Sequence, residues 1–340
     1  MILRPEPSPR HHAQSPGLRL SAPATPVPSW LRRAVDSART VEDAAIAAGA
    51  AIGALDAVVR RQERWAGVWR QRLALSAAAV TARQTGRVED EAALRDAVLF
   101  ARPGDILSGS TTLGPAGLWL VAWRRLAGRP AEGLLTKKTL AAVLDEFGHA
   151  HDEEVVSSLV DEFRQLGASA GTVEMLTGAV AAALRHGFGS GVGAWLADAL
   201  LAQRLGWVHA VPLLGAEQVF GTGAARPRRA ASGIAASEPD SGRAKGLLAA
   251  QARAALRAID LSVELERRAD RLLAIAPKLR AKGADAIVQQ LLSDDALVAS
   301  RGDKKAAMSD RGLRRLFDRL VDLGAVRELS GRLTFRIYGL

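Results

Sequence analysis

Apolar side chains recur at helical spacing along most of this 340-residue chain, and this repeat constrains the fold more than any other feature. Apolar residues three and four positions apart lie on one face of an α-helix, and that face is stabilised when it is buried against other elements. The pattern predicts helices over residues 41–61, 65–83, 115–126, 136–147, 153–167, 172–186 and 194–206. We therefore expect a bundle of several antiparallel helices.

The composition also favours helices over sheets. Alanine, leucine and arginine dominate, and tyrosine occurs once. Alanine and straight-chain side chains lose least on entering a helix. A chain of this length can bury the core of one large domain or two smaller ones without help from metals or disulfides. Because cysteine is absent, disulfides, thiolate nucleophiles and thiolate metal sites are excluded.

The N-terminal residues do not resemble a secretory signal, because prolines interrupt them and no continuous apolar core follows. The longest uncharged stretch, residues 106–123, has 18 residues but contains several glycines and a proline among serines and threonines. Such a composition is unfavourable for a membrane span. We expect a cytoplasmic protein without a membrane-spanning segment.

Two breaks in the helical pattern predict the domain organisation. Residues 1–28 hold seven of the fourteen prolines and few large apolar residues, so we expect a disordered arm. A second break, rich in glycine, alanine, serine and arginine, predicts a linker or exposed loop. The predicted parts are the arm (1–28), a helical domain (30–218), the linker (219–243), a long helix (244–280) and a small C-terminal domain (281–340).

The C-terminal domain begins with short helices predicted over residues 284–292 and 294–300, and its third helix carries the clearest signals. Ser309 is suited to cap the helix at residues 310–323, and Gly324 stands where a left-handed residue commonly ends a helix. The apolar residues of this helix form one stripe. They are Leu313, Leu316, Phe317, Leu320 and Leu323.

A basic hairpin is predicted after this helix. Residues 326–329 and 332–338 flank Ser330 and Gly331, which suit a tight turn, and apolar residues alternate with Arg332, Thr334 and Arg336. Three helices followed by a basic hairpin are typical of a winged helix. The predicted fold class is therefore mostly α: a multi-helix bundle followed by a small C-terminal winged helix.

The positive charge is concentrated in this C-terminal region. The last forty residues contain ten Lys and Arg against five Asp and Glu. Their net charge of +5 is half of the formal net charge of +10 of the whole chain. Arginine can contact phosphates and guanine edges through two parallel hydrogen bonds. The candidate DNA-binding residues are Arg311, Arg314, Arg315 and Arg319 of the helix and Arg327, Arg332 and Arg336 of the hairpin. The alternative is a protein-contact module whose arginines are solvated or paired with Asp318 and Asp322.

Other clusters have simpler structural interpretations. The histidines and carboxylates of residues 149–154 lack the spacing of helical metal ligands, and Asp152 is suited to cap a helix. The glycines of residues 187–193 lack the lysine of a phosphate-binding loop and are expected to separate two helices. The acidic residues 89–91 are expected at a helix start, and the paired tryptophans 65/69 and 119/123 in the core. We predict no metal site, no cofactor and no identifiable catalytic residue.

Several separated motifs resemble DUF1403, an uncharacterised bacterial family of unknown function. They are residues 65–75, 86–96, 114–117, 122–127, 196–205 and 211–214, and the resemblance extends over most of residues 30–340. It implies no established activity and no catalytic residue. Residues 314–320, 326–332 and 338–340 also resemble the helix-turn-helix ending of the bacterial DUF1612 family, which implies DNA binding.

The first functional hypothesis is a DNA-associated regulatory protein that binds double-stranded DNA through its C-terminal winged helix. The helical domain could dimerise and set the spacing of DNA half-sites. A second hypothesis is a helical enzyme or ligand-binding domain, with its site around residues 149–154 or 187–193 and a C-terminal module that is only regulatory. A third is a scaffold for protein interactions.

Overall fold

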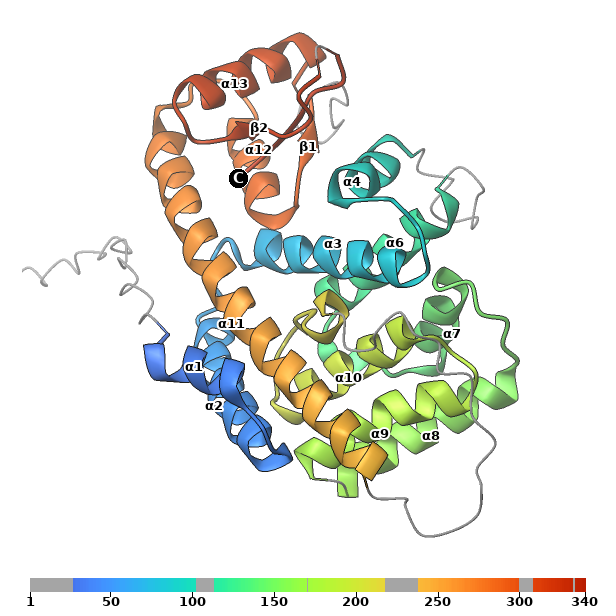
Figure 1. The fold of residues 1–340 in the computed structure, drawn as a ribbon. Helices are drawn as coiled ribbons and strands as arrows, with labels where there is room; N and C mark the ends of the chain where they lie inside the picture. Colours follow the sequence, from blue (N-terminus) through green and yellow to red (C-terminus); the bar gives the residue numbers. More distant parts are fainter. Residues whose placement is uncertain (1–26, 102–112, 170, 218–237, 300–307, 333) are drawn as a thin grey trace, which may run out of the picture.

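Helices dominate the computed structural model, which describes residues 27–101, 113–169, 171–217, 238–299, 308–332 and 334–340 (Figure 1). These residues form twelve α-helices and one three-stranded sheet near the C-terminal end, which confirms the mostly α fold class. The α-helices are α1 (Ser29–Ser37), α2 (Val41–Arg60), α3 (Ala66–Gln84), α4 (Glu91–Phe100), α6 (Gly114–Gly128), α7 (Lys137–Glu146), α8 (Glu153–Ser169), α9 (Thr172–Arg185), α10 (Ser190–Arg204), α11 (Glu238–Ile275), α12 (Ala284–Ser293) and α13 (Asp310–Asp322). Short 3₁₀ turns lie at η1 (Ala131–Gly133), η2 (Leu214–Ala216) and η3 (Ala276–Lys278).

All seven helices predicted between residues 41 and 206 are present, with ends within a few residues of those expected. The helix α1 was not predicted, because it has nine residues and buries only Leu31 and Val35, too few for a clear periodic pattern. The predicted arm and linker lie mostly outside the described residues, which exclude 1–26 and 218–237.

The long helix α11 connects the helical part of the molecule with the C-terminal segment, by which we mean residues 281–340 (Figure 1). Its 38 residues correspond to about 57 Å at 1.5 Å per residue. Along this length α11 packs mainly against α2, with further contacts to α1, α3 and α9. We call helices α1–α10 the helical body.

The core of the helical body is built around buried tryptophans. Trp69, Trp123 and Trp195 are fully buried, and each indole N–H donates a hydrogen bond. The acceptors are the carbonyl oxygen of Ala258 at 2.9 Å, the hydroxyl of Thr81 at 3.1 Å and the carbonyl oxygen of Ala122 at 2.9 Å, respectively. The paired tryptophans therefore belong to the core, as predicted. None of the helices among the described residues is long and apolar enough to cross a membrane.

The C-terminal segment contains α12, β1 (Leu297–Val298), α13, β2 (Arg327–Glu328) and β3 (Ile337–Gly339) in that order. The last strand, β3, lies in the middle of the sheet and pairs antiparallel with both neighbours. The helix predicted at residues 294–300 was wrong, because the chain turns after α12 and forms β1 there. Residues 297–298 pair with β3 there, and the carboxylate of Asp295 pairs with Arg72 and Arg95 of the helical body.

The predicted tight hairpin is also replaced by a longer connection. The N–H of Leu329 donates to the carbonyl oxygen of Ile337 at 2.8 Å, so residues 330–332 and 334–336 belong to a loop between the strands. The Glu328 carboxylate accepts hydrogen bonds from the backbone N–H groups of Ser330 and Gly331, which bends the chain there. Leu333 lies outside the described residues.

This loop contacts the helical body through Phe335. Its backbone has a φ of +55°, uncommon for a residue with a side chain, and its ring packs edge-on against Phe100 of α4 at 5.8 Å. The core of the C-terminal segment is continuous with that of the helical body, because buried residues of α13 and β3 belong to the same apolar cluster. Within it, the rings of Phe317 and Tyr338 stack at 4.4 Å.

Candidate nucleic-acid interface

The helix α13 is amphipathic and lies at the outer end of the C-terminal segment (Figure 1). The Ser309 hydroxyl accepts a hydrogen bond from the N–H of Gly312 at 3.2 Å, and Gly324 ends the helix with a φ of +64°. Both ends agree with the prediction. Four residues of the predicted stripe are buried, whereas Leu323 is partly exposed. Because the stripe faces the core, the arginines must lie on the remaining sides of the helix.

Four arginines of α13 are exposed: Arg311, Arg314, Arg315 and Arg319. None of them forms a side-chain hydrogen bond or an ion pair with another described residue. The acidic neighbours Asp318 and Asp322 do not neutralise them, since Asp318 pairs instead with Arg336 at 3.8 Å. Within the described ranges, the positive charge of this helix is therefore available to solvent or to a ligand.

The three arginines of the predicted hairpin differ from those of α13. Arg332 forms an ion pair with Asp96 of α4, and the Arg336 Nε donates to the carbonyl oxygen of Arg332 at 3.3 Å. Arg327 is exposed. Burial is the main cause that lowers the pKa of Arg268, and the nearby charge of Arg327 lowers it further. The structure brings Arg314 and Arg336 together at a surface cavity of about 340 Å³ beside Tyr338.

A second basic surface was not predicted. A cavity of about 510 Å³ separates α13 from the end of α11, and Lys278 and Arg280 line it opposite Arg315 and Arg319. Apolar residues of both elements form its floor. They are Ile275, Leu279, Leu316 and Leu323. The sequence signal was the basic run 278–282, but only the fold brings this run to α13.

Buried arginines of the C-terminal junction contrast with those of α13. Asp295 is fully buried in its side chain and forms ion pairs with Arg72 of α3 and, at 2.6 Å, with Arg95 of α4. Arg124 of α6 lies nearby. Burial lowers the pKa of Arg124, whereas the negative charges of Asp295 and Asp294 act to raise it. These charges attach the C-terminal segment to the helical body.

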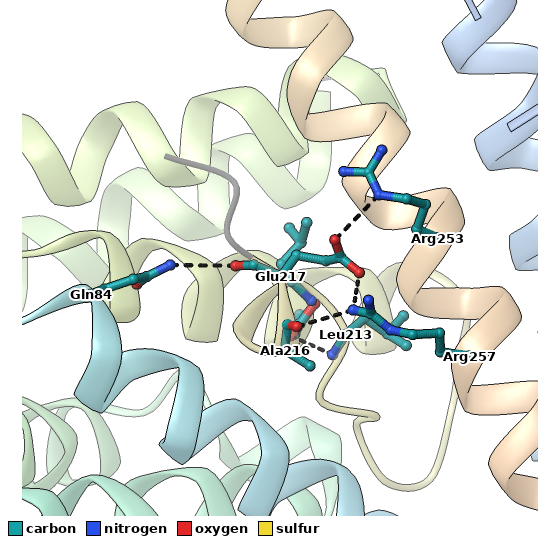
Figure 2. Close-up of polar contacts among 8 residues, drawn as sticks. Gln84, Leu213, Ala216, Glu217, Arg253 and Arg257 are labelled. Carbon is teal, nitrogen blue, oxygen red and sulfur yellow. Dashed lines mark hydrogen bonds and ion pairs between the residues drawn. The ribbon is translucent and has the colours of Figure 1, made fainter. Parts of the chain in front are cut away.

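Two arginines of α11 also share one buried carboxylate (Figure 2). Arg253 and Arg257 both point toward Glu217, which follows η2 and is 5 % exposed. Gln84 donates to the Glu217 carbonyl oxygen at 3.3 Å, and Arg257 donates to the Ala216 carbonyl oxygen at 3.0 Å. Burial raises the pKa of the Glu217 carboxyl, and the two arginines act against that rise. The arginines thus hold the η2 loop to α11.

The remaining sequence candidates have structural roles. Asp152 caps α8 by accepting from the N–H of Val155 at 2.8 Å, and Gly187 ends α9 with a φ of +78°. Asp90 caps α4 in the same way through the N–H of Ala93. The described residues contain no group of three histidine or acidic side chains placed to hold a metal ion.

Comparison with protein families gives a match that covers most of the chain. The sequence pattern of the family described as "Protein of unknown function (DUF1403)" matches residues 19–340. No curated protein and no solved structure matches the chain significantly. Because the matched region includes both the helical body and the C-terminal segment, the protein belongs to the DUF1403 family.

Proposed function

We propose that the protein binds double-stranded DNA through α13 and the β2–β3 region of its C-terminal segment, in the manner of a winged helix. The observation that carries the proposal is the set of four exposed arginines on α13 without partners among the described residues. An unpaired set of guanidinium groups on the solvent-exposed side of a helix suits a polyanion.

The order of elements supports the same proposal. A helix, a strand, a second helix and two further strands, with the last strand in the middle of the sheet, support the proposal, although residues 294–299 do not form the third helix that the sequence predicts. In DNA-binding proteins of the helix-turn-helix type, the N-terminal part of the recognition helix contacts base edges in the major groove. Arg311, Arg314 and Arg315 occupy that part of α13.

The surroundings of α13 assign different tasks to the other cations. Lys278 and Arg280 face Arg315 and Arg319 across the 510 Å³ cavity, where they would contact phosphates beside the inserted helix. Arg332 and Arg336 already contact carboxylates, so DNA phosphates would compete with Asp96 and Asp318 for them. We therefore assign the first contacts to α13. A homodimer remains a prediction that sedimentation would test.

The test uses the full-length protein, because the core is continuous between the two parts. Fluorescence anisotropy would measure binding to labelled duplexes from the protein's own promoter and from a scrambled sequence, over a series of salt concentrations. We expect binding that weakens steeply with salt, because phosphate contacts release counterions. The double variant Arg314→Ala with Arg315→Ala should lose at least about tenfold in affinity.

The matched control removes two exposed arginines of α1 and of the α1–α2 connection, Arg33→Ala with Arg39→Ala. This variant has the same net charge as the α13 variant and should bind DNA as the wild type does. Equal losses in the two variants would mean that binding depends on total charge alone. Absence of binding at moderate salt would contradict the proposal.

A further inference from the structure

A cavity of about 530 Å³ lies where the α2–α3 connection, the loop after α10 and the end of α12 meet. Arg70 of α3 and His209 of the loop line it, with Val208 at its rim and Ser293 on the side of α12. We propose that this cavity binds a small metabolite through an oxyanion group, either a phosphate or a carboxylate. The site is separate from the α13 surface.

Arg70 carries a charge that the described residues leave uncompensated. Its side chain is half-buried, and its Nε donates to the carbonyl oxygen of Ala127 at 2.8 Å. No carboxylate among the described residues forms an ion pair with it, and burial lowers its pKa. Burying a charge without an opposite charge is costly, so an anion in the adjacent cavity would stabilise this guanidinium.

Arg60 also lines this cavity, but its positive charge is compensated by a carboxylate. Its guanidinium forms an ion pair with Asp56 at 2.7 Å and donates to the carbonyl oxygen of Leu205 at 2.8 Å. Glu63 also lines the cavity but does not reach Arg70 to form an ion pair. Of the two arginines that line the cavity, Arg70 is therefore the one available to pair with an anion, because Arg60 already pairs with Asp56.

His209 supplies a second polar group. Burial and then the nearby charge of Arg70 lower its pKa, so the imidazole is neutral at neutral pH and can donate one hydrogen bond. The backbone beside the cavity is strained, because Gln62 has a φ of +46° although it is not a glycine. Such strain is concentrated at functional sites.

The ligand class follows from these groups and from the size of the cavity. Arginine presents parallel N–H donors that match phosphate and carboxylate oxygens. A volume of about 530 Å³ lies within the range of small-molecule sites, and Trp207 and Val208 supply apolar surface for the rest of the molecule. A ligand here would also touch Ser293, the last residue of α12, and so reach the C-terminal segment.

Isothermal titration calorimetry of the full-length protein tests the proposal with inorganic phosphate in one arm and succinate in the other, both at constant ionic strength. We expect saturable binding of one equivalent in at least one arm, and the arm that saturates identifies the oxyanion. Arg70→Met keeps the aliphatic part of the side chain and should weaken binding at least about tenfold. Arg61→Met, which removes an exposed arginine next to the cavity, is the matched control and should bind as the wild type does.

Two further variants make the result decisive. Val208→Glu places a carboxylate on the exposed rim, where it can pair with Arg70, and should abolish anion binding even if Arg70→Met folds poorly. Arg314→Ala with Arg315→Ala should leave it unchanged, which separates this site from phosphate bound at α13. No saturation in either arm, or undiminished binding by Arg70→Met and Val208→Glu, would overturn the proposal.

Discussion

Two arginines of α11, Arg253 and Arg257, lie in the opposite environment from the four arginines of α13. On α11, Arg253 and Arg257 share the buried carboxylate of Glu217 and hold a loop in place (Figure 2). On α13, Arg314 and Arg315 are exposed and have no partner among the described residues. The same residue type thus stabilises the fold in one region and remains available for a ligand in the other.

The difference shows why net charge alone is a poor guide to function. The formal charge of +10 includes arginines such as Arg72 and Arg95, which both pair with the buried carboxylate of Asp295 inside the molecule. These cannot contact DNA. Exposed cations without a carboxylate partner contribute most to the external field that attracts a polyanion, and α13 presents four such arginines.

Removal of the buried carboxylate should have the largest effect. Asp295→Ala leaves Arg72 and Arg95 mostly buried without their counter-charge, and we expect it to lower the free energy of unfolding by about 3–5 kcal/mol. Urea denaturation followed by circular dichroism measures this change. Asp322→Ala on the exposed side of α13 is the control and should stay within about 0.5 kcal/mol of the wild type. Similar values for both variants would show that the Asp295 cluster does not hold the fold.

A buried carboxylate without an arginine provides a second contrast. Asp198 accepts hydrogen bonds from the backbone N–H groups of Leu213 and Leu214, and burial raises its pKa to about 7. This folded-state pKa lies above the unfolded value, so the folded protein holds the proton more tightly. The contribution of Asp198 to stability therefore falls as the pH rises from about 4 to about 7, on the order of 4 kcal/mol in total.

The Asp198→Asn variant isolates this effect, because asparagine does not titrate. Its free energy of unfolding, minus that of the wild type, should increase between pH 4 and pH 7, as measured by denaturation at several pH values. A pH-independent difference would mean that Asp198 stays ionised in the folded protein throughout this range.

The arginines of α11 should have an intermediate effect. Arg253→Ala with Arg257→Ala leaves the buried Glu217 without its ion pairs, and we expect a loss of about 1–3 kcal/mol. Both arginine side chains are partly exposed, so solvent screening keeps the loss below that of Asp295→Ala. Adding Glu217→Gln to the double variant should recover part of the loss, whereas no recovery would show that the carboxylate is not the cause.

The ion pair between the loop and α4 should have the smallest effect. Arg332 is half exposed, and Asp96→Asn should change the free energy of unfolding by less than about 1 kcal/mol. The same variant releases Arg332 and should leave DNA affinity equal or slightly higher in anisotropy titrations. Weaker DNA binding would contradict the view that Asp96 competes with phosphate.

Local signals account for what could be predicted from the sequence. The cap at Ser309, the apolar stripe and Gly324 determine α13 within one short segment, so its ends agreed with expectation. Helices of the body followed from the same periodicity. In contrast, β1 pairs with β3 at the end of the chain, and Asp295 before it pairs with Arg95, 200 residues earlier. No local pattern records such contacts.

The candidate sites also differ in whether local sequence signals or tertiary contacts determine them. The exposure of the four arginines of α13 could be predicted, because exposed positions follow from helical spacing. The proximity of Lys278 and Arg280 to Arg315 was missed, because it depends on how α11 meets α13. The cavity at Arg70 could not be predicted either, since its uncompensated charge is visible only when the surrounding carboxylates are located.

The most direct test of this account measures stability and DNA affinity together for two double variants. We predict that Arg253→Ala with Arg257→Ala lowers the free energy of unfolding but keeps DNA affinity, at a temperature where it remains folded. Arg314→Ala with Arg315→Ala should keep the stability and lose at least about tenfold in DNA affinity. Equal DNA affinity in the two variants would contradict the claim that the unpaired arginines of α13 bind DNA.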